Sequence, residues 1–306
     1  MVTKTDKTTI CAFARMVWRT VGAICERVSG DVLDPDRLLG LVDIGVDEIS
    51  WKKHHNYLTL VSHHATGKIV WGKAGKDTET LNSFFDELPE GAAEKLEAVS
   101  MDLGPAYAKS VRTRAPRATI CFDPFHVVKL VTEALDAVRR QVWQSARKLC
   151  DQSIAEKFTG ARWALVKNPL DLTEDQSGTL REIKRTGGAL WRAYQLKESL
   201  RAVFAGDLDP TDTSVMLDRW CSKAQRSRIP EFVKTARTIR KHRDGIDAAI
   251  DRGLSNGRQE GLNNKVRLII RRAYGFHSPE AALAAVMLTC GPVNLKLPYH
   301  TPAIHM

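Results

Sequence analysis

The sequence has little cysteine and no long apolar run, and each absence excludes a class of protein. Its six cysteines are scattered without a C-x-x-C pair, which argues against a zinc ribbon within this chain and against a disulfide framework. No apolar run approaches the roughly 18 residues of a membrane-spanning helix. The polar N-terminus does not resemble a secretory signal. We therefore expect a cytoplasmic protein with no membrane partner.

Acidic residues are scarce in one long stretch of an otherwise ordinary globular composition. The formal net charge is +10, which favours a polyanionic partner such as DNA. The stretch from Arg219 to Arg243 is densely basic and has few acids to balance it. A solvated helix face would explain part of this pattern, but the imbalance favours a track for DNA phosphates. Arg237 and Arg240 are its candidate DNA-binding residues.

Apolar runs and turn residues between residues 41 and 122 predict an α/β layer. The β-runs are residues 41–49, 57–62, 68–71, 96–101 and 118–122. The first three lie close together, as in an antiparallel meander. Helical spacing over residues 77–88 and 106–114 separates the later runs. This order predicts a sheet covered by helices.

The regions before and after this predicted α/β layer are expected to be helical. Residues 8–28 predict two short helices, which form either part of a helix-turn-helix with Arg19 facing DNA or a plain two-helix adaptor. Strand signals vanish after Lys129, and helical runs continue to Asp251. The expected divisions are residues 1–36 (partial helix-turn-helix and linker), 37–128 (first part of the α/β domain), 129–251 (helical insertion) and 252–306 (second part of the α/β domain).

Two acids follow strands that can be neighbours in this sheet. Asp47 is expected at the end of the first strand and Asp102 at the end of the fourth. In an open α/β sheet, ligands bind beyond the carboxyl ends of adjacent strands. Two carboxylates about 4 Å apart repel by roughly 4 kcal/mol at an effective dielectric near 20, so the pair favours a bound cation. Oxygen-only ligands favour Mg²⁺ or Mn²⁺ over zinc.

A third acid lies in the basic helix predicted after the turn pair Asn256-Gly257. Glu260 sits in the first turn of this helix, with Arg258 and Lys265 among the surrounding bases. One interpretation is an acid that stabilises the helix dipole or forms a salt bridge. The other is a helix that packs across the first two acids and adds a third carboxylate. The helix alone does not decide between them.

Four runs in this order resemble the conserved blocks of bacterial insertion-sequence transposases of the ISL-three family. They are IGVDE (Ile44–Glu48), MDLGPAYA (Met101–Ala108), FDPFHVVK (Phe122–Lys129) and SNGRQEGLNNKVRLIIRRAYGF (Ser255–Phe276). The phrase NPLDLTEDQ (Asn168–Gln176) also resembles the helical insertion of that family.

The resemblance implies an RNase H-like catalytic domain with Asp47, Asp102 and Glu260 as an Asp-Asp-Glu triad that binds two Mg²⁺ or Mn²⁺ ions. It also implies DNA-mediated transposition, in which water cuts the ends of the element and the freed 3′-hydroxyl attacks target DNA. The partners would be the element ends and target DNA, bound by a homo-oligomer at the nucleoid.

Asp123 and His126 match an Asp-x-x-His pattern that follows the second acid in several transposase groups. The resemblance implies accessory roles, with His126 contacting the scissile phosphate or orienting Asp102. The alternative is structural: Asp123 caps the following helix and His126 packs beneath it. Trp163, Trp191 and Trp220 each lie beside an arginine, which allows base stacking, but core packing is the simpler interpretation of each.

The sequence departs from the family pattern at its start. Family members carry an N-terminal zinc-binding segment and a complete helix-turn-helix, whereas this chain has neither paired cysteines nor more than a partial helix-turn-helix. We expect a shortened copy or a late start codon. Two alternative functions therefore stay open: a non-catalytic DNA-binding fragment that represses transposition, and a Mg²⁺-dependent nuclease on the same fold.

Overall fold

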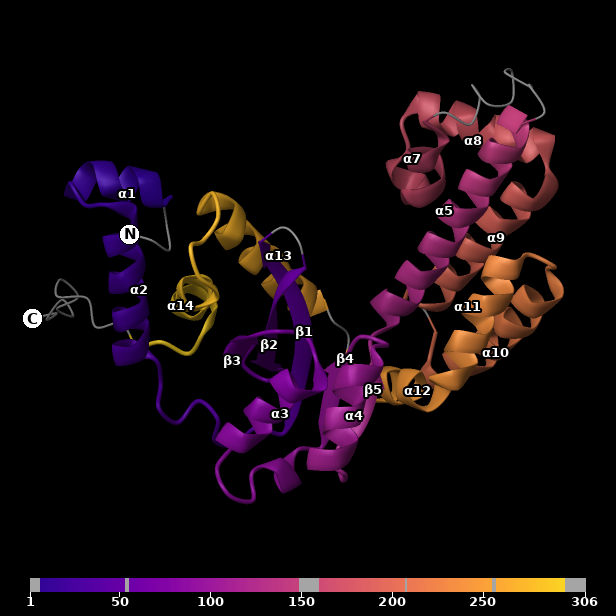
Figure 1. The fold of residues 1–306 in the computed structure, drawn as a ribbon. Helices are drawn as coiled ribbons and strands as arrows, with labels where there is room; N and C mark the ends of the chain where they lie inside the picture. The colour runs from indigo at the N-terminus through magenta and orange to yellow at the C-terminus, as the bar shows by residue number, and fades with distance from the viewer. Residues whose placement is uncertain (1–5, 53–54, 149–159, 207, 255–256, 295–306) are drawn as a thin grey trace, which may run out of the picture. The chain divides into compact units, whose positions relative to one another are not determined.

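The computed structural model describes residues 6–52, 55–148, 160–206, 208–254 and 257–294 (Figure 1). The chain divides into two compact units. The first combines residues 1–121 with 255–306, and the second is residues 122–254. Buried apolar side chains are present in both units.

A five-stranded mixed sheet in the order β3-β2-β1-β4-β5 forms the centre of the first unit. The strands are β1 (Asp43–Lys52), β2 (Asn56–His63), β3 (Lys68–Ala74), β4 (Ala98–Met101) and β5 (Thr119–Phe122). The first three form an antiparallel meander, and β4 pairs parallel with β1. Gly67, with a φ of 63°, supplies the left-handed residue of the turn between β2 and β3. The predicted meander and the mixed α/β class are confirmed.

Helices cover both faces of this sheet because side chains alternate along each strand. Ile49 and Leu58 belong to the core cluster that includes residues of α13 and α14. Thr59, the next residue after Leu58, points to the opposite face, where its hydroxyl lies 2.8 Å from the hydroxyl of Tyr107 in α4. The covering helices are α3 (Thr78–Glu87), α4 (Pro105–Arg114), α13 (Gly257–Arg272) and α14 (Pro279–Cys290).

Two helices precede the sheet, as the sequence predicts. They are α1 (Lys7–Ala14) and α2 (Trp18–Val32). Asp6 caps α1 by accepting a hydrogen bond from the backbone N–H of Thr9 at 2.8 Å. Arg15, which directly follows the last residue of α1, has a left-handed φ of 50°. Val21 and Cys25 of α2 are buried against α14, so this pair packs on the sheet unit.

Beyond Phe122, the described residues of the second unit form helices joined by turns and loops, with no strand. Its helices are α5 (Pro124–Lys148), α7 (Ala161–Val166), α8 (Glu174–Thr186), α9 (Gly188–Val203), α10 (Pro210–Arg226), α11 (Pro230–Lys241) and α12 (Arg243–Asp251). Thr173 and Gln176 form a capping box at the start of α8. Among the described residues of both units, no helix combines the length and the apolar character that crossing a membrane requires.

Trp163, Trp191 and Trp220 of the second unit differ in environment. Trp220 is buried, and its indole N–H donates to the backbone oxygen of Leu196 at 2.8 Å. Trp191 is half-buried and stacks on Tyr194 at a centroid distance of 5.3 Å. Trp163 is exposed, with the Arg162 guanidinium 5.5 Å from its ring centroid. Core packing therefore describes Trp220 and does not describe Trp163.

Candidate active site

Asp47 lies inside β1, at the point where that strand loses one of its two neighbours. β1 pairs with β2 as far as Lys52, but it pairs with β4 only over its first three residues, which end at Gly45. The expectation that Asp47 ends the first strand is therefore wrong. The strand continues to Lys52 because β2 still supplies hydrogen-bond partners after the pairing with β4 has ended. Asp47 thus lies just beyond the paired part of β4.

Asp102 directly follows β4 and faces the same edge of the sheet. The parallel register pairs Gly45 with Ser100, so two more steps along both strands bring Asp47 beside Asp102. Neighbouring strands are about 4.8 Å apart, a separation that short carboxylate side chains can span. The condition set from the sequence, that the first and fourth strands are neighbours, is met.

Hydrogen bonds hold both oxygens of the Asp47 carboxylate. Its Oδ1 accepts from the backbone N–H of Glu48 at 2.6 Å, and its Oδ2 accepts from the side-chain amide of Asn263 in α13. Asn263 is only 8% exposed. Sequence reasoning missed Asn263, although it follows Glu260 by three residues and such residues share one side of a helix.

The helix that carries Glu260 is packed against β1. Leu262 and Val266 of α13 are buried in the same cluster as Ile49 of β1. Glu260 and Arg258 belong to the first turn of α13, and their side chains lie outside the described part of the structure. The backbone of α13 therefore brings the third predicted acid to the Asp47 side of the sheet, one helical turn before Asn263.

The phenol of Tyr107 is buried close enough to the acids for their charges to raise its pKa. Tyr107 is 5% exposed, and burial raises the pKa of its phenol. The hydrogen bond with Thr59 lowers this pKa, and the negative charges of Glu48, Asp47 and Asp102 raise it further. All three carboxylates thus share one electrostatic neighbourhood with the Tyr107 hydroxyl. This tyrosine had no signal in the sequence.

The direction of the hydrogen bonds around Tyr107 follows from counting protons. The Thr59 hydroxyl donates its single hydrogen to the backbone oxygen of Gly75 at 2.9 Å. Thr59 must then accept from Tyr107, so the phenol proton points toward Thr59, the cross-strand partner of Glu48. Tyr107 anchors the start of α4, and therefore the loop that carries Asp102, to β2.

The donor atoms at this edge suit a hard divalent cation. Asp47 and Asp102 offer carboxylate oxygens, the donors that Mg²⁺ and Mn²⁺ prefer. Within the part of the chain that the structure describes, no three His, Cys, Asp or Glu side chains are grouped closely enough to hold a metal ion. The described acids therefore fit two positions of a three-acid site whose third candidate, Glu260, has its side chain outside that part.

Asp123 and His126 lie at the start of the second unit and contact each other. Asp123 is 3% exposed, and its Oδ1 accepts from the backbone N–H of Phe125 at 2.9 Å, which caps α5. Its Oδ2 lies 3.7 Å from the Nε2 atom of His126. Asp123 therefore caps the helix that follows it, as its structural interpretation predicts. An accessory catalytic role for either residue stays a prediction.

The candidate DNA-binding residues are exposed wherever their side chains are described. Arg19 in α2, Lys265 in α13 and Arg237 in α11 face solvent. Arg240 is also exposed, and its guanidinium donates to Gln225 at 2.7 Å.

Arg243, the last residue of the basic stretch, is paired with acids and is therefore not part of its excess positive charge. Its guanidinium lies 2.7 Å from carboxylate oxygens of both Asp218 and Asp247, and it also donates to the backbone oxygen of Ser214. This arginine joins α10 to α12 and does not belong to a phosphate track. The acids that neutralise it are Asp218, 25 residues earlier in α10, and Asp247, four residues later in α12 itself.

The mixed sheet order and the acids at one of its edges define an RNase H-like α/β protein of the class that acts on nucleic acids. The profile of the DDE transposase family ISL3, described as "Transposase", matches residues 44–286. The chain therefore belongs to the ISL-three family of DDE transposases, whose function is DNA transposition.

Curated relatives carry the same description. The transposase for insertion sequence element IS1557 from two strains of Mycobacterium tuberculosis is 46% identical over 313 residues, which cover 96% of this chain and 70% of the relative. The transposase for insertion sequence element IS1001 of Bordetella parapertussis is 29% identical over 273 residues, which cover 89% of this chain and 66% of the relative. Family members of this kind use divalent metal ions to cleave and transfer DNA.

Proposed function

We propose that this protein cuts DNA at the ends of an insertion sequence and joins the freed 3′-hydroxyls to target DNA, with Asp47, Asp102 and Glu260 as its catalytic acids. The observation that supports the proposal most strongly is the register of β1 and β4, which brings Asp47 beside Asp102. The hydrogen bond from Asn263 to Asp47 further supports it, because Asn263 lies on α13, the helix that carries Glu260.

The residues around the acids fix their orientation before DNA binds. Asn263 and the Glu48 amide leave Asp47 one arrangement of its carboxylate. Tyr107 fastens the α4 side of the site to β2. Two Mg²⁺ or Mn²⁺ ions held by the three acids would activate the attacking hydroxyl and stabilise the leaving oxygen. Such preorganised acids avoid rearrangement during the reaction.

The basic residues hold the substrate. Exposed arginines and lysines of α10 and α11 contact DNA phosphates in this proposal, and Arg19, Lys265 and Arg258 do so in the first unit. We further propose that residues 129–251 are an insertion within a catalytic domain formed by residues 37–128 and 252–306, and that residues 1–36 contribute to DNA binding. Because two ends must be cut and joined together, the active species is a homo-oligomer assembled on DNA at the nucleoid.

A cleavage assay tests the proposal. The inverted repeats that flank the gene supply the duplex, one strand is labelled, and wild type is compared with Asp102→Asn in Mg²⁺. We expect wild type to cut at the repeat end and to join it to a second duplex, whereas Asp102→Asn binds the duplex and does neither. The substitution changes a single carboxylate oxygen to an amide, so it preserves shape and removes charge.

The alternative functions give different results in the same assay. A protein that binds the repeat without cutting it in Mg²⁺ or Mn²⁺ is a DNA-binding repressor. A protein that nicks both repeat and unrelated duplexes and never joins them is a nuclease. Either result would contradict the proposal.

A further inference from the structure

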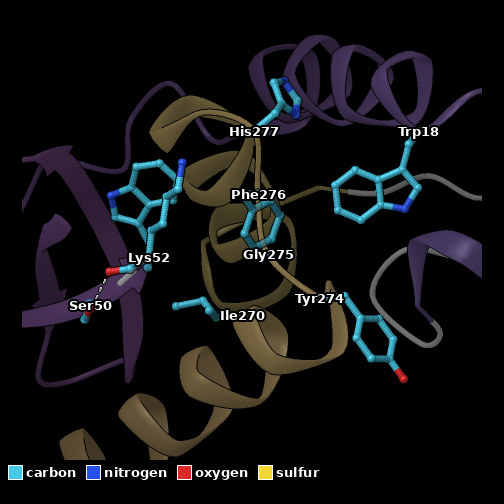
Figure 2. Close-up of a pocket in the computed structure, with 9 residues that line it drawn as sticks. Trp18, Ser50, Lys52, Ile270, Tyr274, Gly275, Phe276 and His277 are labelled. Atoms are coloured by element: carbon cyan, nitrogen blue, oxygen red, sulfur yellow. Dashed lines mark hydrogen bonds between the residues drawn. The ribbon is translucent and has the colours of Figure 1, made fainter. Parts of the chain in front are cut away.

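An open pocket of about 640 Å³ lies in the first unit, at the far end of the strand that carries Asp47 (Figure 2). Its walls come from the end of β1, the first residue of α2 and the loop between α13 and α14. Lys52 lies five residues after Asp47 on β1, about 17 Å at 3.3 Å per residue. That separation equals roughly five base-pair steps of duplex DNA. A DNA strand held at the acids can therefore reach this pocket.

Aromatic side chains from three distant segments surround the opening. Figure 2 shows the rings of Trp18, Phe276 and Tyr274 arranged around it, and Trp51 forms the wall on the β1 side. Trp51 and Phe276 are buried, whereas Tyr274 is 84% exposed. The backbone of Tyr274 is left-handed, with a φ of 51°, a conformation that few residues other than glycine adopt. A bulky aromatic residue held in solvent by such a turn lacks a packing role.

One cation lines the pocket, and two more precede its Tyr274 wall along the chain. Lys52 is exposed, and its ammonium lies 5.9 Å from the centroid of the Trp51 ring. Arg271 and Arg272 are exposed in the last turn of α13, three and two residues before Tyr274. His277 also lines the pocket, with a Glu26 carboxylate oxygen 3.8 Å from its Nε2 atom. Aromatic surfaces next to cations match a nucleotide, which presents a planar base and a phosphate.

We propose that this pocket receives one unpaired nucleotide of the bound DNA. Its base stacks on Tyr274 and Trp18, and its phosphate lies against Lys52 and Arg271. The volume falls within the range of about 300–1,000 Å³ that is typical of small-ligand sites. A paired base inside a duplex cannot enter, so the pocket selects DNA that is bulged, frayed or melted near the cut. The inference rests on the proposed function for the identity of the polymer, and its test does not require cutting.

Fluorescence anisotropy measures whether the protein prefers DNA with an unpaired base. The full chain is titrated, with EDTA present, into two labelled duplexes of equal length and sequence, one of which has a single unpaired adenine. We expect wild type to prefer the bulged duplex by roughly tenfold, because stacking one base on an aromatic side chain contributes about 1–3 kcal/mol. Tyr274→Ala should remove most of this preference, and Tyr274→Phe, which keeps the ring, should retain it. Phe13→Ala is the matched control because Phe13 is 75% exposed and does not line the pocket.

Three results would overturn the proposal: equal affinity of wild type for both duplexes, equal weakening of both by Tyr274→Ala, or the same loss of preference in Phe13→Ala. A melting curve for Tyr274→Ala confirms that the fold is intact. Asp102→Asn is titrated in parallel and should keep the preference for the bulged duplex. A protein that selects the bulge and never cuts would contradict the proposed function and leave the pocket assignment standing.

Discussion

Asp47 is the acid whose surroundings are most fully determined. Each of its oxygens accepts a hydrogen bond, one from its own strand and one from Asn263, which is 216 residues away in the sequence. Hydrogen bonds to a charged group contribute about 1.5–3 kcal/mol. The Asn263 contact therefore joins α13 to β1 and orients the carboxylate that we propose as catalytic.

Replacing Asn263 should impair cleavage without unfolding the protein. Asn263→Ala removes the donor to Asp47, and losses of supporting residues around metal-binding carboxylates are typically 10- to 100-fold. We expect a loss of that order in the cleavage rate and a higher Mg²⁺ concentration at half-maximal rate. Asn264→Ala is the control because its side chain is exposed on the same helix. Equal rates for wild type and Asn263→Ala would show that Asp47 does not depend on this contact.

Tyr107 makes a stability prediction with a defined pH dependence. Tyr107→Phe removes the hydroxyl that donates to Thr59, which should lower the free energy of unfolding by about 1 kcal/mol near neutral pH. The pKa of Tyr107 is raised above its ordinary value of about 10, so the folded state keeps a proton that the unfolded state releases. Wild type should therefore lose stability as pH rises above about 10, and the gap between the two proteins should narrow.

Urea unfolding at pH 7 and at pH 10.5 measures this gap. The other ionisable groups are common to both proteins, so their contributions cancel in the difference. A gap that stays constant, or that widens with pH, would contradict the assigned burial of the Tyr107 phenol.

At the scale of elements, Asp123 caps the start of α5, and two substitutions distinguish this structural role from a catalytic one. Asp123→Asn keeps an equally good N-cap while removing the charge, whereas Asp123→Ala removes both. If Asp123 assists the reaction, Asp123→Asn should match wild type in thermal stability and cleave more slowly. Asp123→Ala should in addition lower the stability by about 1 kcal/mol. Full cleavage activity in Asp123→Asn would leave capping as the only role of this residue.

The basic helices of the second unit make a prediction about salt. Replacing Arg237 and Arg240 with Ala should weaken DNA binding and reduce the slope of log K against log salt by about one for each lost phosphate contact. Arg240 also donates to Gln225 and Ser222, so Arg237→Ala alone is the cleaner variant. Arg185→Ala is the control, since Arg185 pairs with Glu182 at 2.8 Å in α8. An unchanged slope for Arg237→Ala would exclude a phosphate contact.

Periodicity predicts most elements of this chain and fails where an element depends on a distant partner. The β-meander and the paired helices before it carry local apolar patterns and turn residues, so their order could be predicted. The extension of β1 to Lys52 could not, because it depends on pairing with β2. The same limit explains why Asp47 was assigned to a strand end.

For the molecule as a whole, the candidate site combines segments that the sequence separates. Asp47 and Asp102 could be paired in advance because both follow from strand order. The contacts of Asn263 and Tyr107 and the aromatic pocket could not, since each depends on a strand of the sheet packing against a segment distant in the sequence. The ion pair of Arg243 with Asp218 depends on the packing of α10 against α12, whereas Asp247 lies one helical turn after Arg243 and could be paired with it from the sequence.

The net charge of +10 and the division into two units fit a protein in which one unit carries the acids and the other adds basic surface for DNA. The proposal depends most on three carboxylates, Asp47 of β1, Asp102 after β4 and Glu260 of α13, which bind the metal ions that cutting requires. This claim concerns ion binding, so it can be tested before any reaction occurs.

Counting Mn²⁺ ions on the DNA-bound protein by electron paramagnetic resonance tests that claim most directly. We expect two tightly bound ions per catalytic site in wild type, in line with two-metal phosphoryl transfer. We expect at most one in Asp47→Asn, Asp102→Asn and Glu260→Gln. The same number of tightly bound ions in wild type and in all three variants would contradict the account.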